Sequence, residues 1–202
     1  MLTLAESIDV WLFFLINRSG QNAFFDVYMP FMSDLRNFYI PIVLLLLYLI
    51  IRKSIKTRTV AVAIILLIGM SEWVSSDLLK PAFNRPRPYH SLSHVHYYDR
   101  MAKTWNVTPE LKETIRGRSL SLPSSHATNI FAAAFFMTFF FRRLWPVCYI
   151  IAVSVGYSRV YLGVHFPFDV LLGAIVGTLC GTLLAWLAHR VILYLEKRQL
   201  SG

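Results

Sequence analysis

The chain has 202 residues, of which 56% are hydrophobic, and a formal net charge of +9 at neutral pH. Its length suits one domain, and several apolar runs approach the length of a membrane span, which excludes an ordinary soluble protein. The Lys and Arg residues lie between the apolar runs, so membrane topology and anionic head groups explain the charge better than nucleic acid does. We predict an all-α, polytopic membrane bundle with about five to six transmembrane helices, formed by one domain over residues 1–202.

The N-terminal region, residues 4–35, contains two apolar pieces, Val10–Ile16 and Ala23–Met32, that are each too short to span a bilayer. Polar residues and a proline interrupt the second piece, at Asp26, Pro30 and Asp34. We predict interfacial or re-entrant helices here, with a single poor span as the alternative. The first piece has no basic stretch before it, so we interpret it as retained and not as a cleaved signal peptide.

Five further apolar runs predict transmembrane helices over residues 37–51, Thr59–Leu79, Leu122–Phe141, Leu144–Leu162 and Pro167–Leu195. The last run carries Gly173, Gly177 and Gly181 at a spacing of four, which predicts close packing of that helix face on a neighbour. The polar segment between the second and third runs, about residues 81–121, is too long for a tight turn. We predict that it forms a cap with some helix around Pro109–Ile115.

The alternation of these spans places their ends on two faces of the membrane. One face receives the polar motifs, with Lys80, Arg87, Ser124, His126, Arg159, His165 and Asp169. The other receives short basic loops, with Arg52, Lys53, Lys56, Arg58, Arg142, Arg143, Lys197 and Arg198. Short basic loops mark the cytoplasmic side. We therefore expect the motifs to converge on the periplasmic or extracellular face of a bacterial plasma membrane.

The first motif is cationic, and the second lies at the start of a predicted helix. The stretch Lys80–Pro88 holds three cations and three prolines at a helix exit, which fits either a rigid phosphate-binding rim or a snorkelling basic flank. The stretch Leu122–His126 opens the third span, where free N–H groups and serine hydroxyls offer an anion site. His126 is placed there to donate a proton to a leaving oxygen, although plain serine capping fits the same pattern.

The third motif is the stretch Tyr157–Asp169. Pro167 is suited to the first turn of a helix, which puts His165 just before the helix and Asp169 in its first turn. A carboxylate that holds one imidazole nitrogen leaves the other free as a nucleophile or base. The alternative interpretation is a His and an Asp at the membrane boundary that are satisfied by water.

Taken together, the three motifs resemble the signature of the type 2 phosphatidic acid phosphatase superfamily. That signature has Lys, six residues and Arg-Pro; then Pro-Ser-Gly-His; then Ser-Arg, five residues, His, three residues and Asp. Every part occurs here in order and with the same internal spacing, as Lys80…Arg87-Pro88, Pro123-Ser124-Ser125-His126 and Ser158-Arg159…His165…Asp169. One position departs from the pattern, because Ser125 stands where the family usually has Gly.

The resemblance implies a role for each motif residue. His165 attacks phosphorus and forms a phosphohistidine, Asp169 orients His165, and His126 protonates the leaving group. The phosphoryl oxygens are held by Lys80, Arg87, Ser124, Ser125 and Arg159. The resemblance implies no metal and no cofactor, because side-chain cations take the place of a metal ion. The expected partners are the lipid bilayer and a membrane lipid phosphate, with no nucleic acid.

Several lipid phosphates fit this prediction, namely undecaprenyl pyrophosphate, phosphatidylglycerol phosphate, phosphatidic acid and the 1-phosphate of lipid A. The sequence does not choose among them, nor between monoester and pyrophosphate, and it leaves the oligomeric state open. A non-catalytic phosphate- or lipid-binding membrane protein or transporter is the alternative, which the complete set of His126, His165 and Asp169 disfavours. Vanadate-dependent haloperoxidases share the signature but are soluble.

Overall fold

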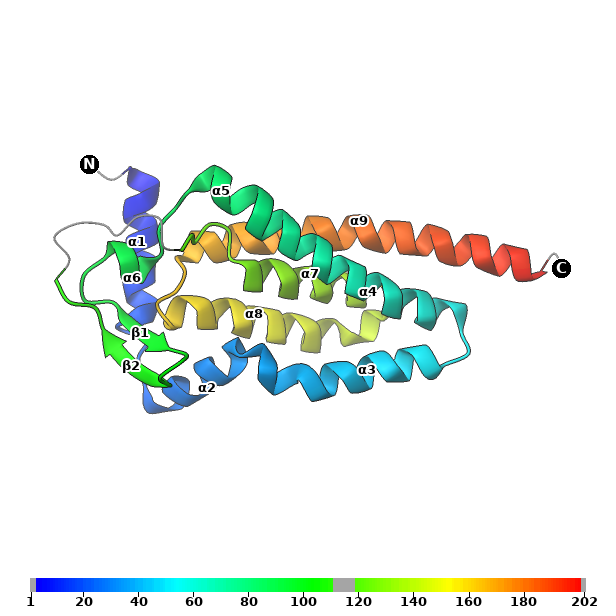
Figure 1. The fold of residues 1–202 in the computed structure, drawn as a ribbon, viewed down its shortest axis with the longest axis horizontal. Coiled ribbons are helices and arrows are strands. Elements are labelled where there is room, and N and C mark those ends of the chain that lie inside the picture. Colours follow the sequence, from blue (N-terminus) through cyan, green and yellow to red (C-terminus); the bar gives the residue numbers. More distant parts are fainter. Residues whose placement is uncertain (1–2, 111–118, 201–202) are drawn as a thin grey trace.

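A computed structural model describes residues 3–110 and 119–200, and within these ranges the chain is mostly helical (Figure 1). The α-helices are α1 Leu4–Asn17, α2 Ala23–Ser33, α3 Tyr39–Ile51, α4 Ile55–Trp73, α5 Lys80–Phe83, α6 Pro88–Ser91, α7 Ser125–Phe140, α8 Trp145–Tyr161 and α9 Pro167–Leu200. A π-helical segment, η2 Val74–Leu79, joins α4 to α5, and two short 3-10 helices, η1 Leu35–Phe38 and η3 Arg142–Leu144, precede α3 and α8. Two strands are present, β1 His96–Asp99 and β2 Thr104–Val107.

The long helices run side by side along the length of the molecule, and α1 crosses one end of the bundle (Figure 1). Two continuous helical stretches within the described residues are long and apolar enough to cross a membrane, Ile55–Phe83 and Pro167–Leu200. A third is counted if Ala23–Ser33 and Leu35–Ile51, which meet at a bend of 71°, form one broken span. The chain is therefore an integral membrane protein.

The sequence predicts five to six transmembrane helices, but fewer helices among the described residues are long enough to cross a membrane. Helices α7 and α8 have 16 and 17 residues, and at about 1.5 Å of rise per residue each is shorter than a typical hydrocarbon core of about 30 Å. They still pack in the same bundle as the longer α4 and α9. Residues 4–35 were predicted to form interfacial or re-entrant helices or one poor span. In the structure α1 crosses the end of the bundle, and α2 continues into α3 through the bend at Asp34.

The second predicted span continues past its expected end through the π-helical segment η2 into α5. The wider π-turn changes the helical register, so that Asp77 is exposed while Lys80 lies over the bundle. The ion pairs among the described residues do not include the pair Asp77–Lys80 that an ordinary helix would favour. Asn84 then adopts a left-handed conformation with φ of 46° and ends the helix just before the prolines of the first motif.

The polar cap contains an antiparallel hairpin of β1 and β2, which corrects the all-α prediction. Tyr98 pairs with Trp105 in its register, and both strands are rich in aromatic residues that favour extended structure. The Asp99 carboxylate accepts the N–H groups of Met101 and Ala102 and so forms the turn between the strands. Most of the helix expected around Pro109–Ile115 lies outside the described residues, and Pro109 is not helical.

Helices α7 and α9 form the closest seam of the bundle, as the glycine spacing predicts. Gly173, Gly177 and Gly181 are all buried against α7. A Cβ atom at Gly177 would lie 2.1 Å from the Thr128 backbone oxygen, so only glycine permits this approach. At the cap end of the seam the Ser124 N–H donates to the Asp169 carbonyl over 3.0 Å, which joins the N-terminal ends of the two helices.

Candidate active site

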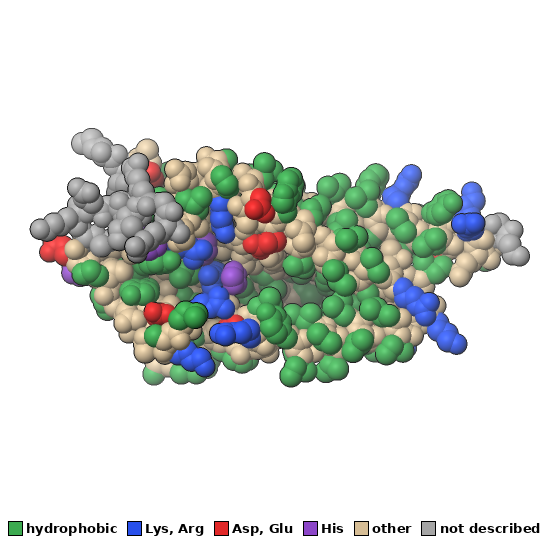
Figure 2. All heavy atoms as spheres, in the orientation of Figure 1, with side chains coloured by type: hydrophobic (Ala, Val, Ile, Leu, Met, Phe, Trp, Pro, Cys, Tyr) green, Lys and Arg blue, Asp and Glu red, His purple; other side chains and the backbone are tan. Residues whose placement is uncertain are grey.

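The polar motifs, which are far apart in the sequence, meet at the cap end of the bundle. This end collects α5, the first turns of α7 and α9 and the last turn of α8 (Figure 1). Figure 2 shows Lys and Arg side chains gathered near a His beside the cap, a second basic group at the opposite end, and hydrophobic side chains over much of the surface between them. The structure therefore brings the motifs together, as the alternation of spans predicts.

His165 lies in the short loop between α8 and α9, and Asp169 lies in the first turn of α9. Gly163, with φ of +73°, turns the chain out of α8, and the Arg159 carbonyl accepts the His165 N–H over 3.2 Å. Both side chains are buried, and 3.5 Å separates His165 Nδ1 from Asp169 Oδ2. The same carboxylate oxygen accepts the Phe166 N–H over 2.8 Å. This arrangement places the carboxylate beside Nδ1 of the imidazole.

Arg159 comes from the last turn of α8 and is 4% exposed. One guanidinium nitrogen donates to the Ser33 hydroxyl at the end of α2. The Nε atoms of Arg159 and Arg87 and the Nδ1 atom of His165 are buried without a hydrogen-bond partner among the described residues. Buried donors of this kind are costly unless something accepts from them. An anion with several oxygens, such as a phosphoryl group, would satisfy these two guanidinium donors.

Lys80 reaches the start of α7 from the end of the second span. Its Nζ donates to the Ser125 hydroxyl over 2.6 Å, and Ser76 lies 3.0 Å from the same hydroxyl. Ser125 is the position where the family signature has glycine. The added hydroxyl therefore accepts a hydrogen bond from the lysine that the signature assigns to phosphate. This contact places Lys80 at the N-terminal end of α7, the positive end of the helix dipole.

Ser124 and His126 belong to the same helix start. Ser124 is fully buried, and its hydroxyl caps α7 by accepting the Ala127 N–H over 3.5 Å. His126, in the first turn, has Arg159 and His165 among its electrostatic neighbours. The capping interpretation of Ser124 is thus realised in the structure, while the charges of Arg159 and His165 act on His126.

The charges around His165 determine its protonation. Burial lowers the pKa of the His165 imidazole well below its ordinary value, and nearby cations lower it further. These cations are Arg87, Arg159 and Lys80. The imidazole is therefore neutral at pH 7, which is the form that carries a free electron pair. Among the described residues, no group of three or more His, Cys, Asp or Glu side chains is arranged to hold a metal ion.

Arg85 is a site residue to which the motif analysis assigned no role. It donates to the Asp169 carboxylate over 2.8 Å, and its guanidinium lies 4.0 Å from the centre of the Phe166 ring. Ser33 was also missed, because it reaches Arg159 from a helix remote in the sequence. The position of Arg85 inside the first motif, between Lys80 and Arg87, was the available signal.

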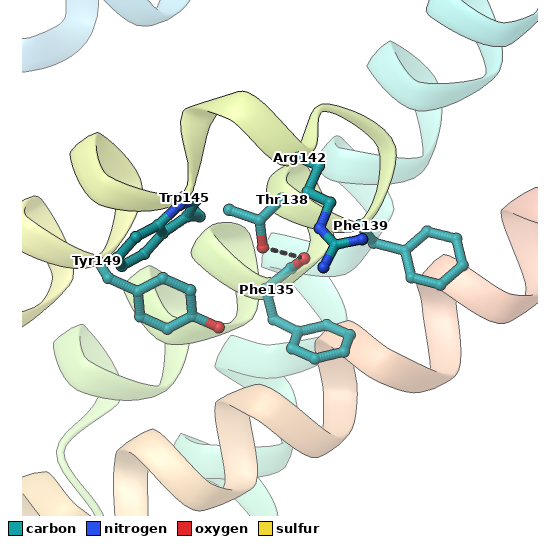
Figure 3. Close-up of a pocket in the computed structure, with 6 residues that line it drawn as sticks. All are labelled: Phe135, Thr138, Phe139, Arg142, Trp145 and Tyr149. Atoms are coloured by element: carbon teal, nitrogen blue, oxygen red, sulfur yellow. Dashed lines mark hydrogen bonds between the residues drawn. The ribbon is translucent and has the colours of Figure 1, made fainter.

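Two hollows among the described residues differ in their relation to this site. The larger, of about 490 Å³, lies where α7 and α8 join at the far end of the bundle; Figure 3 shows its lining of Phe135, Thr138, Phe139, Arg142, Trp145 and Tyr149. It contains no residue of the three motifs. The smaller, of about 250 Å³, is lined in part by Ser33, the partner of Arg159, and by Arg100. The smaller hollow therefore adjoins the motif residues although the larger does not.

A family model for the PAP2 superfamily matches residues 60–193 of this chain. The chain belongs to the PAP2 superfamily. A lipid A 4'-phosphatase of Bacteroides thetaiotaomicron is 28% identical to it over 204 residues, with 97% of this chain and 84% of the relative covered. The family match confirms the resemblance inferred from the motifs. Together with the relative, it shows that the chain is a phosphatase and hence a hydrolase.

Two solved structures share its architecture. The crystal structure of Aquifex aeolicus LpxE is 26% identical, with a TM-score of 0.61 over 88% of this chain and 94% of that one. The transmembrane PAP2-type phosphatidylglycerolphosphate phosphatase of Bacillus subtilis is 23% identical, with a TM-score of 0.67 over 94% and 89% of the two chains. The second similarity supports the fold alone. Both similarities show that the chain shares the fold of these two structures.

Proposed function

We propose that this protein hydrolyses a membrane lipid phosphate or lipid pyrophosphate through a phosphohistidine on His165, without a metal ion. The observation that carries the proposal is a buried neutral imidazole, held beside Asp169 and surrounded by cations with unpartnered donors. Binding of phosphate by itself would need the cations but not the buried His–Asp pair. The pair therefore favours catalysis over a transporter or a lipid-binding scaffold.

In the first step His165 Nε2 donates its electron pair to phosphorus, and an N–P bond forms. The P–O bond to the leaving oxygen breaks, and its electron pair stays on that oxygen. In this scheme the negative charge of the bound phosphate offsets Arg159 and the other cations near His126, so that His126 carries a proton and donates it to the leaving oxygen of the lipid alcohol, or of the lipid monophosphate from a pyrophosphate. Asp169, facing Nδ1, stabilises the positive charge that develops on the His165 imidazole.

In the second step a water molecule attacks the phosphohistidine. Its oxygen bonds to phosphorus, the N–P bond breaks, and the electron pair returns to His165. The water gives its proton to His126, which restores the general acid for the next turnover. The sum of the two steps is water plus lipid phosphate giving lipid alcohol plus inorganic phosphate, or water plus lipid pyrophosphate giving lipid monophosphate plus inorganic phosphate.

The cations supply the charge neutralisation that phosphoryl transfer requires. In this scheme Arg87 and Arg159 use their planar forks to hold the equatorial phosphoryl oxygens, and Lys80 acts as a point charge. Ser124, Ser125 and the N–H groups at the start of α7 add hydrogen bonds at the positive end of the helix dipole. Because their positions are set by α5, α7 and α8, these groups need little rearrangement when substrate binds.

For the substrate we propose a lipid whose phosphate sits at the membrane surface, with a lipid A phosphate first among the candidates. The support is that relatives aligned along nearly the whole chain are named lipid A 4'-phosphatases, in Bacteroides thetaiotaomicron and Porphyromonas gingivalis. Undecaprenyl pyrophosphate, phosphatidylglycerol phosphate and phosphatidic acid are the competing substrates. Phosphate release from a panel of these four purified lipids should show the highest kcat/KM on lipid A. A higher value on any other lipid would replace this assignment.

The chemistry is tested by trapping the intermediate. Rapid acid-free quenching of the wild-type protein with a ³²P-labelled substrate should give an acid-labile, base-stable phosphoenzyme. The His165→Ala variant should give neither phosphoenzyme nor turnover while keeping its thermal unfolding transition. Turnover should persist in excess chelator. Substantial phosphate release by folded His165→Ala protein, or loss of activity in chelator that Mg²⁺ restores, would refute the mechanism.

We further propose that the site faces the periplasmic or extracellular side of the plasma membrane, because the far end of the bundle carries the short basic loops. The test uses a variant in which Cys148 and Cys180 are replaced by serine, with one new cysteine at exposed Lys53, Arg142 or Lys103. In intact cells an impermeant thiol reagent should label only position 103. Labelling of positions 53 and 142 instead would put the site in the cytoplasm.

A further inference from the structure

Helix α1 contributes a carboxylate, Asp9, that is completely buried at the cap end of the bundle. Its Oδ2 atom accepts from Arg85 over 2.6 Å, and its Oδ1 atom accepts the Phe168 N–H over 2.9 Å. Asp9 lies far outside residues 60–193, the region that the family model matches. Its contacts nevertheless reach the first turn of α9, one residue before Asp169.

Arg85 joins Asp9 to Asp169 with two different nitrogens of one guanidinium. NH2 donates to Asp9 over 2.6 Å and NH1 donates to Asp169 over 2.8 Å. The guanidinium also stacks on Phe166, next to His165 in the loop. A planar fork can span two carboxylates in this way, whereas the single nitrogen of a lysine cannot.

This bridge helps to fix the orientation of the Asp169 carboxylate. Oδ1 accepts from Arg85, and Oδ2 accepts the Phe166 N–H while lying 3.5 Å from His165 Nδ1. With both oxygens held, the carboxylate cannot rotate away from the imidazole. Without Arg85, the buried Asp169 carboxylate would lose its cation and would keep only neutral donors, such as the Phe166 N–H, beside His165.

We infer that Asp9 and Arg85 are positioning residues for the reaction, which hold Asp169 and through it His165 in the geometry for attack. The inference rests on the proposed role of His165 as nucleophile. It makes α1 a functional part of the site and not only an interfacial anchor. Outer-shell partners of this kind typically change activity by about 10–100-fold when they are removed.

A matched control lies on the same helix. Asn17 is also fully buried, and its amide binds the backbone of His96 and the Tyr161 carbonyl over 2.7–3.0 Å. It anchors the other end of α1 but does not touch Arg85 or Asp169. The Asn17→Ala variant should therefore loosen the helix without disturbing the bridge.

The experiment measures kcat, KM and inhibition by inorganic vanadate, together with thermal unfolding, for Asp9→Asn, Asp9→Glu, Arg85→Lys and Asn17→Ala proteins. The substrate is the panel lipid that the wild type turns over fastest. We expect Asp9→Asn and Arg85→Lys to lower kcat about 10–100-fold, with KM within about threefold. Vanadate affinity should also stay within about threefold, because the phosphate-binding cations are unchanged. Asp9→Glu should recover part of the lost kcat, and Asn17→Ala should keep kcat within about twofold.

Two outcomes would overturn this inference and leave the proposed role of His165 intact. One is a loss of kcat in Asn17→Ala as large as in Asp9→Asn at equal loss of stability, which would make the role one of anchoring α1. The other is a parallel change of kcat and vanadate affinity, which would make it a binding role. If Asp9→Asn does not fold, the comparison of Arg85→Lys with Asn17→Ala decides the same question. Full turnover in folded His165→Ala protein would instead refute the nucleophile, and the inference with it.

Discussion

The two ends of the bundle carry the same residue types in opposite environments. At the cap end Arg159 is 4% exposed, and the carboxylates of Asp9 and Asp169 are fully buried. At the far end Arg142 and Arg143 are exposed, and Lys56 donates to the Phe140 carbonyl at the end of α7. Figure 2 shows the hydrophobic surface that separates these two basic groups.

This difference explains why counting charges does not locate the site. An exposed cation keeps its water and serves topology or caps a helix, so its loss changes little. A buried cation has lost its water and must be compensated by a carboxylate or by a ligand. Arg85 has two carboxylates, whereas Arg87 and Arg159 keep buried donors without partners among the described residues. We therefore propose that these two guanidinium groups bind the phosphoryl group, together with the point charge of Lys80.

The sharpest test of the cap end uses His126 and two leaving groups. General acid catalysis contributes about 10²–10⁴-fold when the leaving oxygen needs a proton. We therefore expect His126→Ala to lower hydrolysis of a lipid monoester by about that factor and to spare much of the activity on p-nitrophenyl phosphate. His165→Ala should lose both activities, because no phosphoenzyme forms.

The measurement is the ratio of kcat/KM losses on the two substrates for each variant. Contact of His126 with the phosphoryl group lowers both rates equally, so only the ratio reports the acid. Equal losses for His126→Ala on the lipid and the aryl phosphate would leave it as a phosphate-binding residue.

A second test compares one arginine from each end. Arg159→Gln removes a buried donor to the phosphoryl group and should lower kcat/KM by about 10²–10³-fold, the cost of losing one transition-state donor. Arg142→Gln removes an exposed charge and should keep kcat/KM within about twofold. Both are measured as phosphate release per folded protein, with folding checked by thermal unfolding.

The Arg159→Lys variant serves where Gln impairs folding, because it keeps the charge but loses the fork. A loss in Arg142→Gln comparable to that in Arg159→Gln would show that overall positive charge, and not the buried site, controls the rate.

The smallest effect is expected for alanine substitutions in the α7–α9 seam, which compare Gly173 near the site with Gly181 farther along the seam. A Cβ at Gly173 would lie 2.7 Å from the Ser124 oxygen, and one at Gly181 would lie 2.7 Å from the Ala132 oxygen. Alanine at either position should lower the free energy of unfolding by about 1–3 kcal/mol through overpacking. Gly173→Ala should also lower kcat about two- to tenfold, because a shift of about 1 Å at a reacting centre can cost about 10²-fold.

Chemical or thermal unfolding in detergent, paired with kcat, checks this contrast. The Gly69→Ala variant is the control for the substitution itself, since a Cβ there meets no atom within 4 Å. An equal loss of kcat in Gly173→Ala and Gly181→Ala would mean that the seam acts only through overall stability.

Much of the architecture could be predicted because its signals are local. Long apolar runs and prolines mark the starts and ends of α7, α8 and α9 to within a few residues. Once the spans are ordered, their alternation places the three motifs at one end, and the family signature names their residues. The glycine spacing predicts the α7–α9 seam for the same reason, because residues four apart share a helix face.

Other features required the tertiary structure. The hairpin β1–β2 was missed because its aromatic residues gain their stability from contacts such as those of Trp105 with Tyr161 on α8. The register shift in η2 was missed because a π-turn leaves no clear pattern in sequence. The number of membrane spans also depends on helix ends that hydropathy places only approximately.

The sequence by itself determined the membrane class and the family and named the residues that we propose for the chemistry, since these follow from composition, order and spacing along the chain. The tertiary structure decided which cations are partnered and which carry unpartnered buried donors. Asp9 and Asp169 are 160 residues apart, and a spacing of that length predicts no contact. Only the folded bundle places the Arg85 guanidinium between them. Both carboxylates are buried, and a buried charge needs a partner of opposite charge.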